Sequence, residues 1–143
     1  MTRQQAPVAA VILGVALATA LRYGREELQT HLITPTYGGV VPNWVPLLSA
    51  PIQVLVILAP GFVSGWVASR RQLLCGFLTG LFGSALYSSV IGTHWPEEVT
   101  GGTSEVLFRI TWLVSNSVSN GLFAAAAAGT AQLLRSNNRW RGP

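Results

Sequence analysis

The sequence predicts an all-α integral membrane protein, with about four transmembrane helices in one compact bundle and both termini in the cytoplasm. Three observations support this prediction. Of the 143 residues, 50% are hydrophobic and only 10% are charged, whereas a soluble domain has about 25% charged residues. The chain contains four long uncharged stretches. Aromatic residues that favour the membrane surface lie near the ends of these stretches, namely Tyr23, Trp44, Trp66, Trp95, Trp112 and Trp140.

The four stretches place the helices at about 7–23, 47–68, 73–92 and 109–134. A helix needs about 20 residues to cross the hydrocarbon core, so the last three are long enough and the first is marginal. The first stretch also has a second interpretation. Arg3, a short apolar run and the small residues 18–20 together are typical of a secretory signal with its cleavage site.

The other segments are predicted to connect one transmembrane domain that comprises residues 1–143. In the outer loop 24–46, the part GREELQTHLI either extends the first helix or lies on the surface, and the Gly- and Pro-rich remainder is expected to be irregular. Residues 93–105 are expected to form a polar outer loop, and residues 135–143 a basic tail.

Arginine placement predicts the orientation, because short loops rich in basic residues stay in the cytoplasm. With four spans, one side of the membrane receives Arg3, Arg70, Arg71, Arg135, Arg139 and Arg141. The other side receives fewer arginines and every acid, namely Arg22, Arg25, Arg109, Glu26, Glu27, Glu97, Glu98 and Glu105. We therefore expect a multi-pass protein of a cell membrane, of the bacterial inner-membrane type.

Small residues form grooves along the second and third helices. They are Gly61 and Gly65 in the second helix, and Gly76, Gly80, Gly83 and Ser84 in the third. Lipid provides no hydrophobic force between helices, so association depends on the close approach that small residues permit. The grooves favour packing of these two helices within the chain; packing against another chain is the alternative.

A polar face is predicted on the fourth helix. Its members are Arg109, Ser115, Asn116, Ser119 and Asn120. Amides inside a membrane need partners because no water is present to satisfy them. The face is therefore expected to form hydrogen bonds between helices, with a conduction or binding path and a partner-facing surface as alternatives. Arg109 lies four residues after Glu105, so a local ion pair also explains its presence.

Several other features have weaker implications. Pro60 lies inside the second helix and is predicted to break or kink it, as at the ion sites of some transporters. The single cysteine, Cys75, is expected to be a small buried side chain. The loop residues His94, Glu97 and Glu98, with His31, match no metal-binding spacing, so no metal or other cofactor is predicted.

The segment VILGVALATALRYG, residues 11–24, resembles the first helix of small fluoride channels, in which a Gly-rich sequence leads to an arginine and an aromatic residue. The resemblance implies a small membrane channel and extends over about a tenth of the chain. Those channels also have an asparagine motif in the second helix and a Thr-Thr-Phe-Ser-type break in the third. This sequence has neither, and its third span reads as Gly-rich and continuous.

No nucleophile motif, nucleotide-binding loop or acid pair inside a span is present in the sequence, so the chain is not expected to be an enzyme or to bind nucleic acid. The expected partners are the lipid bilayer and either other membrane chains or a second copy of this chain. The leading hypothesis is an accessory subunit that packs against other membrane proteins. The alternative is a small homo-oligomeric channel or transporter for an ion or small solute.

Overall fold

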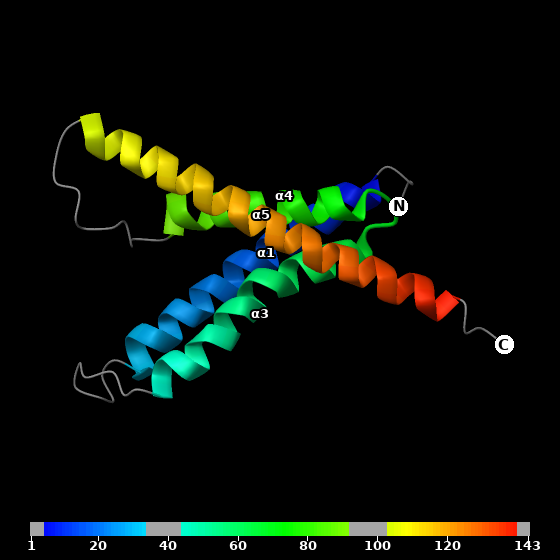
Figure 1. The fold of residues 1–143 in the computed structure, drawn as a ribbon, viewed down its shortest axis with the longest axis horizontal. Coiled ribbons are helices and arrows are strands. Elements are labelled where there is room, and N and C mark those ends of the chain that lie inside the picture. The colour runs from blue at the N-terminus through cyan, green and yellow to red at the C-terminus, as the bar shows by residue number, and fades with distance from the viewer. Residues whose placement is uncertain (1–4, 34–43, 92–102, 140–143) are drawn as a thin grey trace.

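The computed structural model describes residues 5–33, 44–91 and 103–139, and within them it is entirely helical apart from the link at 68–71 (Figure 1). Helix α1 comprises Gln5–Glu27 and continues into a π-helical turn at Leu28–Ile33. Helix α3 comprises Trp44–Val67. Helix α4 comprises Gln72–Leu86 and continues into a second π-helical turn at Tyr87–Ile91. Helix α5 comprises Thr103–Arg139. The prediction of four helices is therefore confirmed.

The helices are longer than predicted, most of all at the C-terminal end of α1 and at both ends of α5. Helix α1 and its π-helical turn reach Ile33, which agrees with the alternative that GREELQTHLI extends the first helix. Helix α5 begins at Thr103, within the predicted polar loop, and includes the start of the predicted tail. The predicted spans stop where charged residues begin, because only uncharged stretches were counted. Ion pairs between residues i and i+4 nevertheless support a helix in these segments. Glu105 pairs with Arg109, and Glu27 lies 3.0 Å from the His31 imidazole.

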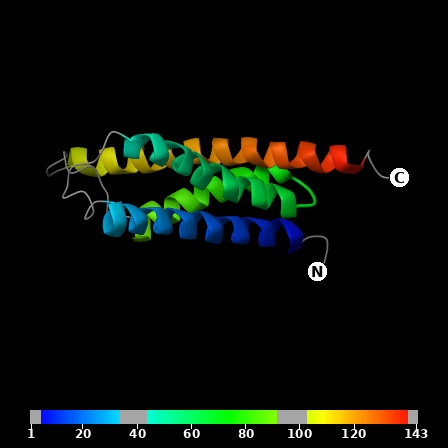
Figure 2. The same cartoon turned by 90° about the horizontal axis from the view of Figure 1, so that it is seen from below.

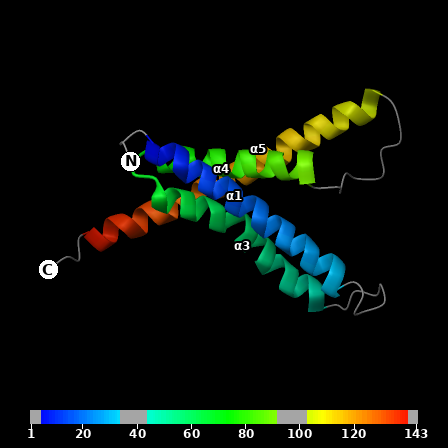
Figure 3. The same ribbon diagram turned by 180° about the vertical axis from the view of Figure 1, so that it is seen from behind.

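The helices form two pairs that cross near the middle of the molecule (Figure 1). Helix α1 lies beside α3, and α4 lies beside α5, with further contacts of α3 to α5 and of α1 to α4. Helices α3 and α4 run obliquely from the level of α1 to the level of α5 (Figure 2). Figure 3 shows the crossing from the face that α1 covers. The start of α1, the link at 68–71 and the end of α5 lie at one end of the molecule.

The interior is made of small and polar side chains, whereas the large apolar side chains point outward. The largest fully buried side chains are Thr79, Pro60, Ser64 and Ser84. Large apolar residues are exposed on every helix, for example Ile12, Leu55, Phe82, Leu122 and Leu133. Two helices, at Pro7–Glu27 and Ala50–Val67, are long and apolar enough by composition to cross a membrane.

The glycine grooves are used inside the chain, but their main partner is α5 and not one another. A Cβ atom added at Gly65 would lie 2.6 Å from the Ala128 Cα, and one added at Gly76 would lie 2.5 Å from the Ala128 Cβ. Gly61 and Gly80 approach the backbone of Ala124 and Asn120 in the same way.

Helix α1 covers another of the predicted groove residues, because an added Cβ at Gly83 would lie 2.8 Å from the Ala18 Cβ. Packing within the chain was therefore predicted, but its geometry was not. Spacing identifies the smooth face of a helix, and it does not identify the helix that covers that face.

The predicted break at Pro60 is absent, since α3 is a continuous helix from Trp44 to Val67. Proline has no N–H group, so the helix loses the hydrogen bond that this residue would donate to the carbonyl of Val56. Pro60 is fully buried, and the following turn packs through Gly61 against α5. The Ser64 hydroxyl also donates to the Gly61 carbonyl at 3.0 Å. These contacts hold the helix together on the C-terminal side of the proline.

Candidate functional site

Ser84, in the last turn of α4, lies at the centre of a polar cluster between three helices. Its side chain is fully buried. Three nitrogen atoms donate to its hydroxyl oxygen: Nη1 of Arg22 at 3.1 Å, Nδ2 of Asn116 at 3.1 Å and Nδ2 of Asn120 at 3.0 Å. Arg22 comes from α1 and both asparagines come from α5, so this hydroxyl joins α1, α4 and α5.

Hydrogen bonds within α5 fix the orientation of both amides. Nδ2 of Asn120 donates to the backbone carbonyl of Asn116 at 2.8 Å, which requires a nitrogen at that position. The same nitrogen lies 3.1 Å from Oδ1 of Asn116. Reversing the Asn116 amide would place two N–H₂ groups against each other. Both asparagines therefore present donors to Ser84.

Arg22 provides the positive charge of the cluster. Its guanidinium lies over the ring of Tyr87, with 5.8 Å from Cζ to the ring centroid. The guanidinium also donates to the Ser84 hydroxyl, as described above. Neither of these two partners, Ser84 and Tyr87, carries a negative charge at neutral pH.

The cluster has more donors than acceptors. A serine oxygen has two lone pairs, and three N–H donors point toward this one. A guanidinium carries five N–H groups, and each amide carries two. This excess, together with the positive charge of Arg22, suits an acceptor that brings negative charge.

The structure brings together only part of the predicted site. Asn116 and Asn120 point inward and meet Ser84, which had been predicted as a packing residue. Ser115 and Ser119 are exposed, because one residue along a helix turns the side chain by about 100°. Arg109 is exposed near the start of α5 and pairs with Glu105, as the local explanation predicted.

Sequence reasoning did not include Arg22 and Tyr87 in the site. Arg22 was counted as an arginine that flanks a membrane span, and it is 62 residues from Ser84 in the chain. One signal that could have identified it is its position after seventeen uncharged residues of α1, with α1 continuing to Glu27. Tyr87 gave no signal, because its ring meets Arg22 only through the packing of α1 on α4.

Two further buried hydroxyls have no hydrogen-bond partner in the described part of the chain. They are Thr79 Oγ1 and Ser117 Oγ. Thr79 lies against Gly14 of α1, where an added Cβ would be 2.6 Å from Thr79 Oγ1. Cys75 is buried as predicted, with its thiol 3.9 Å from the Pro7 carbonyl.

The described residues contain no group of His, Cys, Asp and Glu side chains that could hold a metal ion. His94, Glu97 and Glu98, which were weighed as possible ligands, lie outside the described residues. Catalytic geometry of the kind formed by a nucleophile and a general base is likewise not found among the hydrogen bonds at Ser84, since its contacts are donors.

Comparison with protein-family models, curated proteins and solved structures finds no match to this chain.

Proposed function

We propose that this chain is a small multi-pass membrane protein that binds a small inorganic anion at the Arg22–Ser84–Asn116–Asn120 cluster and lets it pass between the helices. The observation that carries the proposal is the convergence of three N–H donors, one of them cationic, on the buried Ser84 hydroxyl. The proposal corresponds to the channel or transporter alternative of the sequence analysis.

The distribution of side chains supports a place in the membrane. Large apolar residues such as Leu55, Leu122 and Leu133 are exposed, while the fully buried side chains are small or polar. A soluble protein buries its large apolar residues, because their transfer out of water drives folding. In lipid this force is absent between helices. The expected arrangement there has small residues where helices contact one another and large apolar residues facing the lipid. We infer four spans with both termini in the cytoplasm.

The chemistry of the cluster supports an anion as the ligand. A guanidinium inside a membrane bundle is costly unless a negative charge or several acceptors compensate it. Amide and guanidinium donors bind anions through short charge-assisted hydrogen bonds. A cation would meet the positive charge of Arg22 and the N–H groups of both asparagines, and so would be repelled. The donors come from α1 and α5 and the hydroxyl from α4, so the cluster would hold a small ligand from several sides.

The internal use of the packing surfaces favours this proposal over an accessory subunit. The glycine grooves and the asparagine face were the basis for expecting a partner chain. Both are occupied by contacts within the chain. The exposed Ser115 and Ser119 of α5 remain available, and small polar residues of this kind support a contact between two copies. We therefore propose a homo-oligomer.

Fluoride is the first anion to examine, because residues 11–24 resemble the first helix of the fluoride channels. Arg22 and Tyr23 are the arginine and the aromatic residue of that resemblance. Ser84, Asn116 and Asn120 lie outside the resembling segment, so their part in the site comes from the contacts alone.

The test is anion efflux from liposomes that contain the purified protein. Fluoride, chloride and nitrate are loaded as potassium salts, and efflux is followed with ion-selective electrodes. We expect efflux of at least one anion from the wild type and a large loss of it in the Asn116→Leu/Asn120→Leu variant. The matched control is Leu122→Val, which alters an exposed apolar residue of the same helix.

Loss of flux with the oligomer intact, measured by size-exclusion chromatography, would support the anion path. Wild-type protein that passes no anion, but that co-purifies with unlike membrane chains, would instead support the accessory-subunit hypothesis. Equal flux in the wild type and the double variant would contradict the assignment of the path to the asparagines.

A further inference from the structure

The end of the molecule that holds the link at 68–71 carries an open apolar groove. Its volume is about 430 Å³, and its lining residues are Phe62, Val63, Trp66, Val67 and Leu134. The Phe62 and Trp66 rings stack with their centroids 5.9 Å apart. Trp66 is 42% exposed, so its ring forms part of the outer surface. The groove therefore presents an aromatic wall and the last turns of α3 and α5 to the surroundings.

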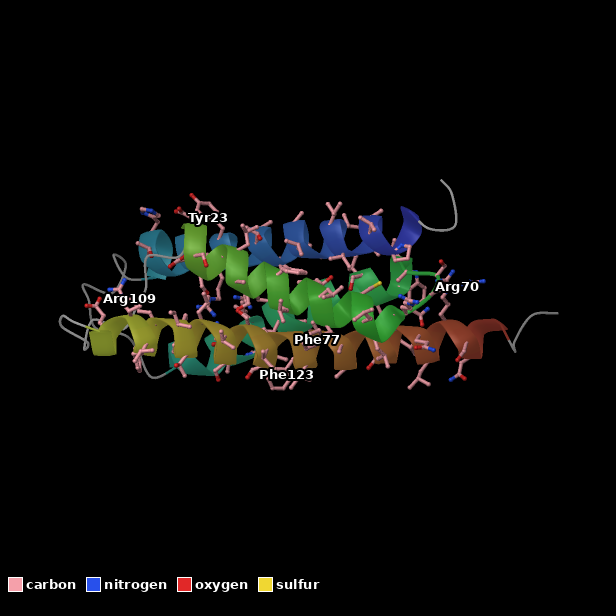
Figure 4. The ribbon with its side chains drawn as sticks, turned by 90° about the horizontal axis from the view of Figure 1, so that it is seen from above. Tyr23, Arg70, Phe77, Arg109 and Phe123 are labelled. Atoms are coloured by element: carbon pink, nitrogen blue, oxygen red, sulfur yellow. The ribbon has the colours of Figure 1, made fainter. Side chains whose placement is uncertain are left out.

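Arg70, Arg71 and Arg135 are among the arginines at this same end. Arg70 and Arg71 are exposed in the link between α3 and α4, and Arg70 lies at the end of the molecule opposite Arg109 and Tyr23 (Figure 4). Arg135 directly follows the groove residue Leu134, and its Nη1 donates to the carbonyls of Trp66 at 3.0 Å and Ala68 at 3.4 Å. Arg135 thereby caps α3 beside the groove.

Acids are absent from this end in the part of the chain that the structure describes. The described acids are Glu26, Glu27 and Glu105, which belong to the last turn of α1 and the first turn of α5. Both of those turns lie at the opposite end of the molecule, where Tyr23 and Arg109 are found (Figure 4). The described charges at the link end are therefore positive, and they lie beside the apolar groove.

Arg71 has an unusual backbone conformation. Arg71 precedes α4 in the left-handed conformation, with φ 53° and ψ 38°. No other non-glycine residue of the described ranges has positive φ. Glycine or asparagine adopts this conformation at lower cost. Arg71 therefore holds its charge at a position where glycine would adopt the same backbone conformation with less strain.

We propose that this end binds an anionic phospholipid, with an acyl chain against the Phe62–Trp66 wall and the phosphate beside Arg70, Arg71 and the free N–H groups of Arg135. The proposal rests on the membrane placement given above and not on the anion path. Basic residues at the cytoplasmic surface attract anionic headgroups, and a tryptophan at the headgroup level keeps its ring half buried and its N–H in water. One lipid then satisfies both the groove and the charges.

The test uses Trp66 as the reporter. In a variant that keeps Trp66 and replaces the other four tryptophans by phenylalanine, quenching is measured with phosphatidylglycerol and with phosphatidylcholine that carry the same brominated acyl chains. We expect stronger quenching by phosphatidylglycerol. Each arginine contributes about a fivefold preference, so Arg70→Gln/Arg71→Asn should reduce the preference about 25-fold. Raising the salt concentration should reduce it as well.

Two controls separate charge from structure. Arg71→Gly keeps the left-handed backbone and removes the charge, so it should lose about fivefold in preference without loss of thermal stability. Arg25→Gln/Arg109→Gln removes the same total charge at the opposite end and should leave the preference unchanged.

Equal quenching of Trp66 by both lipids, with the protein inserted, would overturn the proposed lipid site. Quenching by neither lipid would place Trp66 outside the bilayer, and would overturn both this site and the membrane placement. Anion efflux from the same proteoliposomes should be unchanged in Arg70→Gln/Arg71→Asn, which keeps failure of the lipid site distinct from failure of the anion path.

Discussion

Ser84 shows how much a single small side chain can determine in this bundle. Its hydroxyl accepts from Arg22, Asn116 and Asn120, and it is fully buried between the helices that supply them. Removing an acceptor that serves several buried donors costs the desolvation of each donor left without a partner. The nearby residue Ser117 provides the opposite case, because its buried hydroxyl has no partner in the described part of the chain.

These two serines give the first prediction. Ser84→Ala should lower the free energy of unfolding by roughly 1–3 kcal/mol, because it strands buried N–H groups. Ser117→Ala should be neutral or stabilising, because it removes a buried hydroxyl that lacks a partner. Unfolding in mixed detergent, followed by circular dichroism, measures both. Equal destabilisation by the two substitutions would mean that the hydrogen bonds to Ser84 do not hold the cluster together.

Part of the site was predictable from the sequence because a helix repeats every 3.6 residues. Asn116 and Asn120 lie four residues apart, so the sequence places them on one face, and the rarity of amides in membrane spans marks that face as inward. Ser115 and Ser119 were grouped with them only by proximity in sequence, and they point outward. Arg22 joins the cluster through a contact between distant segments, which a single sequence does not specify.

Helix α5 is the element on which α3 and α4 both pack. Its Ala-rich segment presents small side chains to both α3 and α4. Gly61 and Gly65 of α3 and Gly76 of α4 therefore approach it closely. At Gly80 the contact is between backbones, because an added Cβ would lie 2.7 Å from the carbonyl carbon of Asn120. The position of the two asparagines next to Ser84 therefore depends on this close approach.

The second prediction concerns this contact. Gly80→Ala should force α4 and α5 apart and destabilise the protein by about 1–3 kcal/mol, since the new methyl group meets backbone that has no space to move. Gly24→Ala is the matched control, because no atom lies within 4 Å of a Cβ added there. It should stabilise α1 by up to about 1 kcal/mol through helix propensity. Thermal unfolding in detergent compares the two variants.

A loss of anion efflux should accompany the destabilisation by Gly80→Ala, because the donors of α5 move away from Ser84. If Gly80→Ala were as stable as Gly24→Ala, the backbone contact between α4 and α5 in the structure would be contradicted.

The helices themselves were largely predictable, whereas their ends and partners were not. Apolar runs gave the four helices, since each run is long enough to form one. The extra turns at Leu28–Ile33 and at Thr103 contain charged and polar residues, which hydropathy assigns to loops. Tyr87–Ile91 forms a π-helical turn where a continuous span was expected, and this irregularity has no signature in the residues themselves.

For the molecule as a whole, the path of the chain fixes which segments share an end. The start of α1, the link at 68–71 and the end of α5 lie together (Figure 2). Arg70, Arg71 and Arg135 belong to this end. If the molecule crosses a membrane as proposed, the excess of arginine places this end in the cytoplasm.

The third prediction tests this orientation by cysteine labelling in a Cys75→Ala background. Arg70→Cys should react with a membrane-impermeant maleimide only after the cells are opened. Thr30→Cys, which is exposed at the opposite end, should react from outside. Ile12→Cys should resist labelling from either side, because its exposed side chain would face lipid. Labelling of Arg70→Cys in intact cells would reverse the orientation, and rapid labelling of Ile12→Cys would contradict the membrane placement.

The central claim, that the donor cluster binds a small anion, is tested most directly by anion-dependent thermal stability of the purified protein in detergent. Potassium fluoride, chloride and nitrate are titrated at constant ionic strength with potassium gluconate. An anion that binds the folded state should stabilise the wild type, by about 2.7 kcal/mol when its concentration reaches 100 times the dissociation constant.

Arg22→Gln should abolish this stabilisation and Arg22→Lys should retain part of it, because the charge is kept while the planar donor array is lost. The account predicts an anion-specific rise in the melting temperature of the wild type that Arg22→Gln lacks. A melting temperature that no anion changes, or that rises equally in the wild type and in Arg22→Gln, would contradict it.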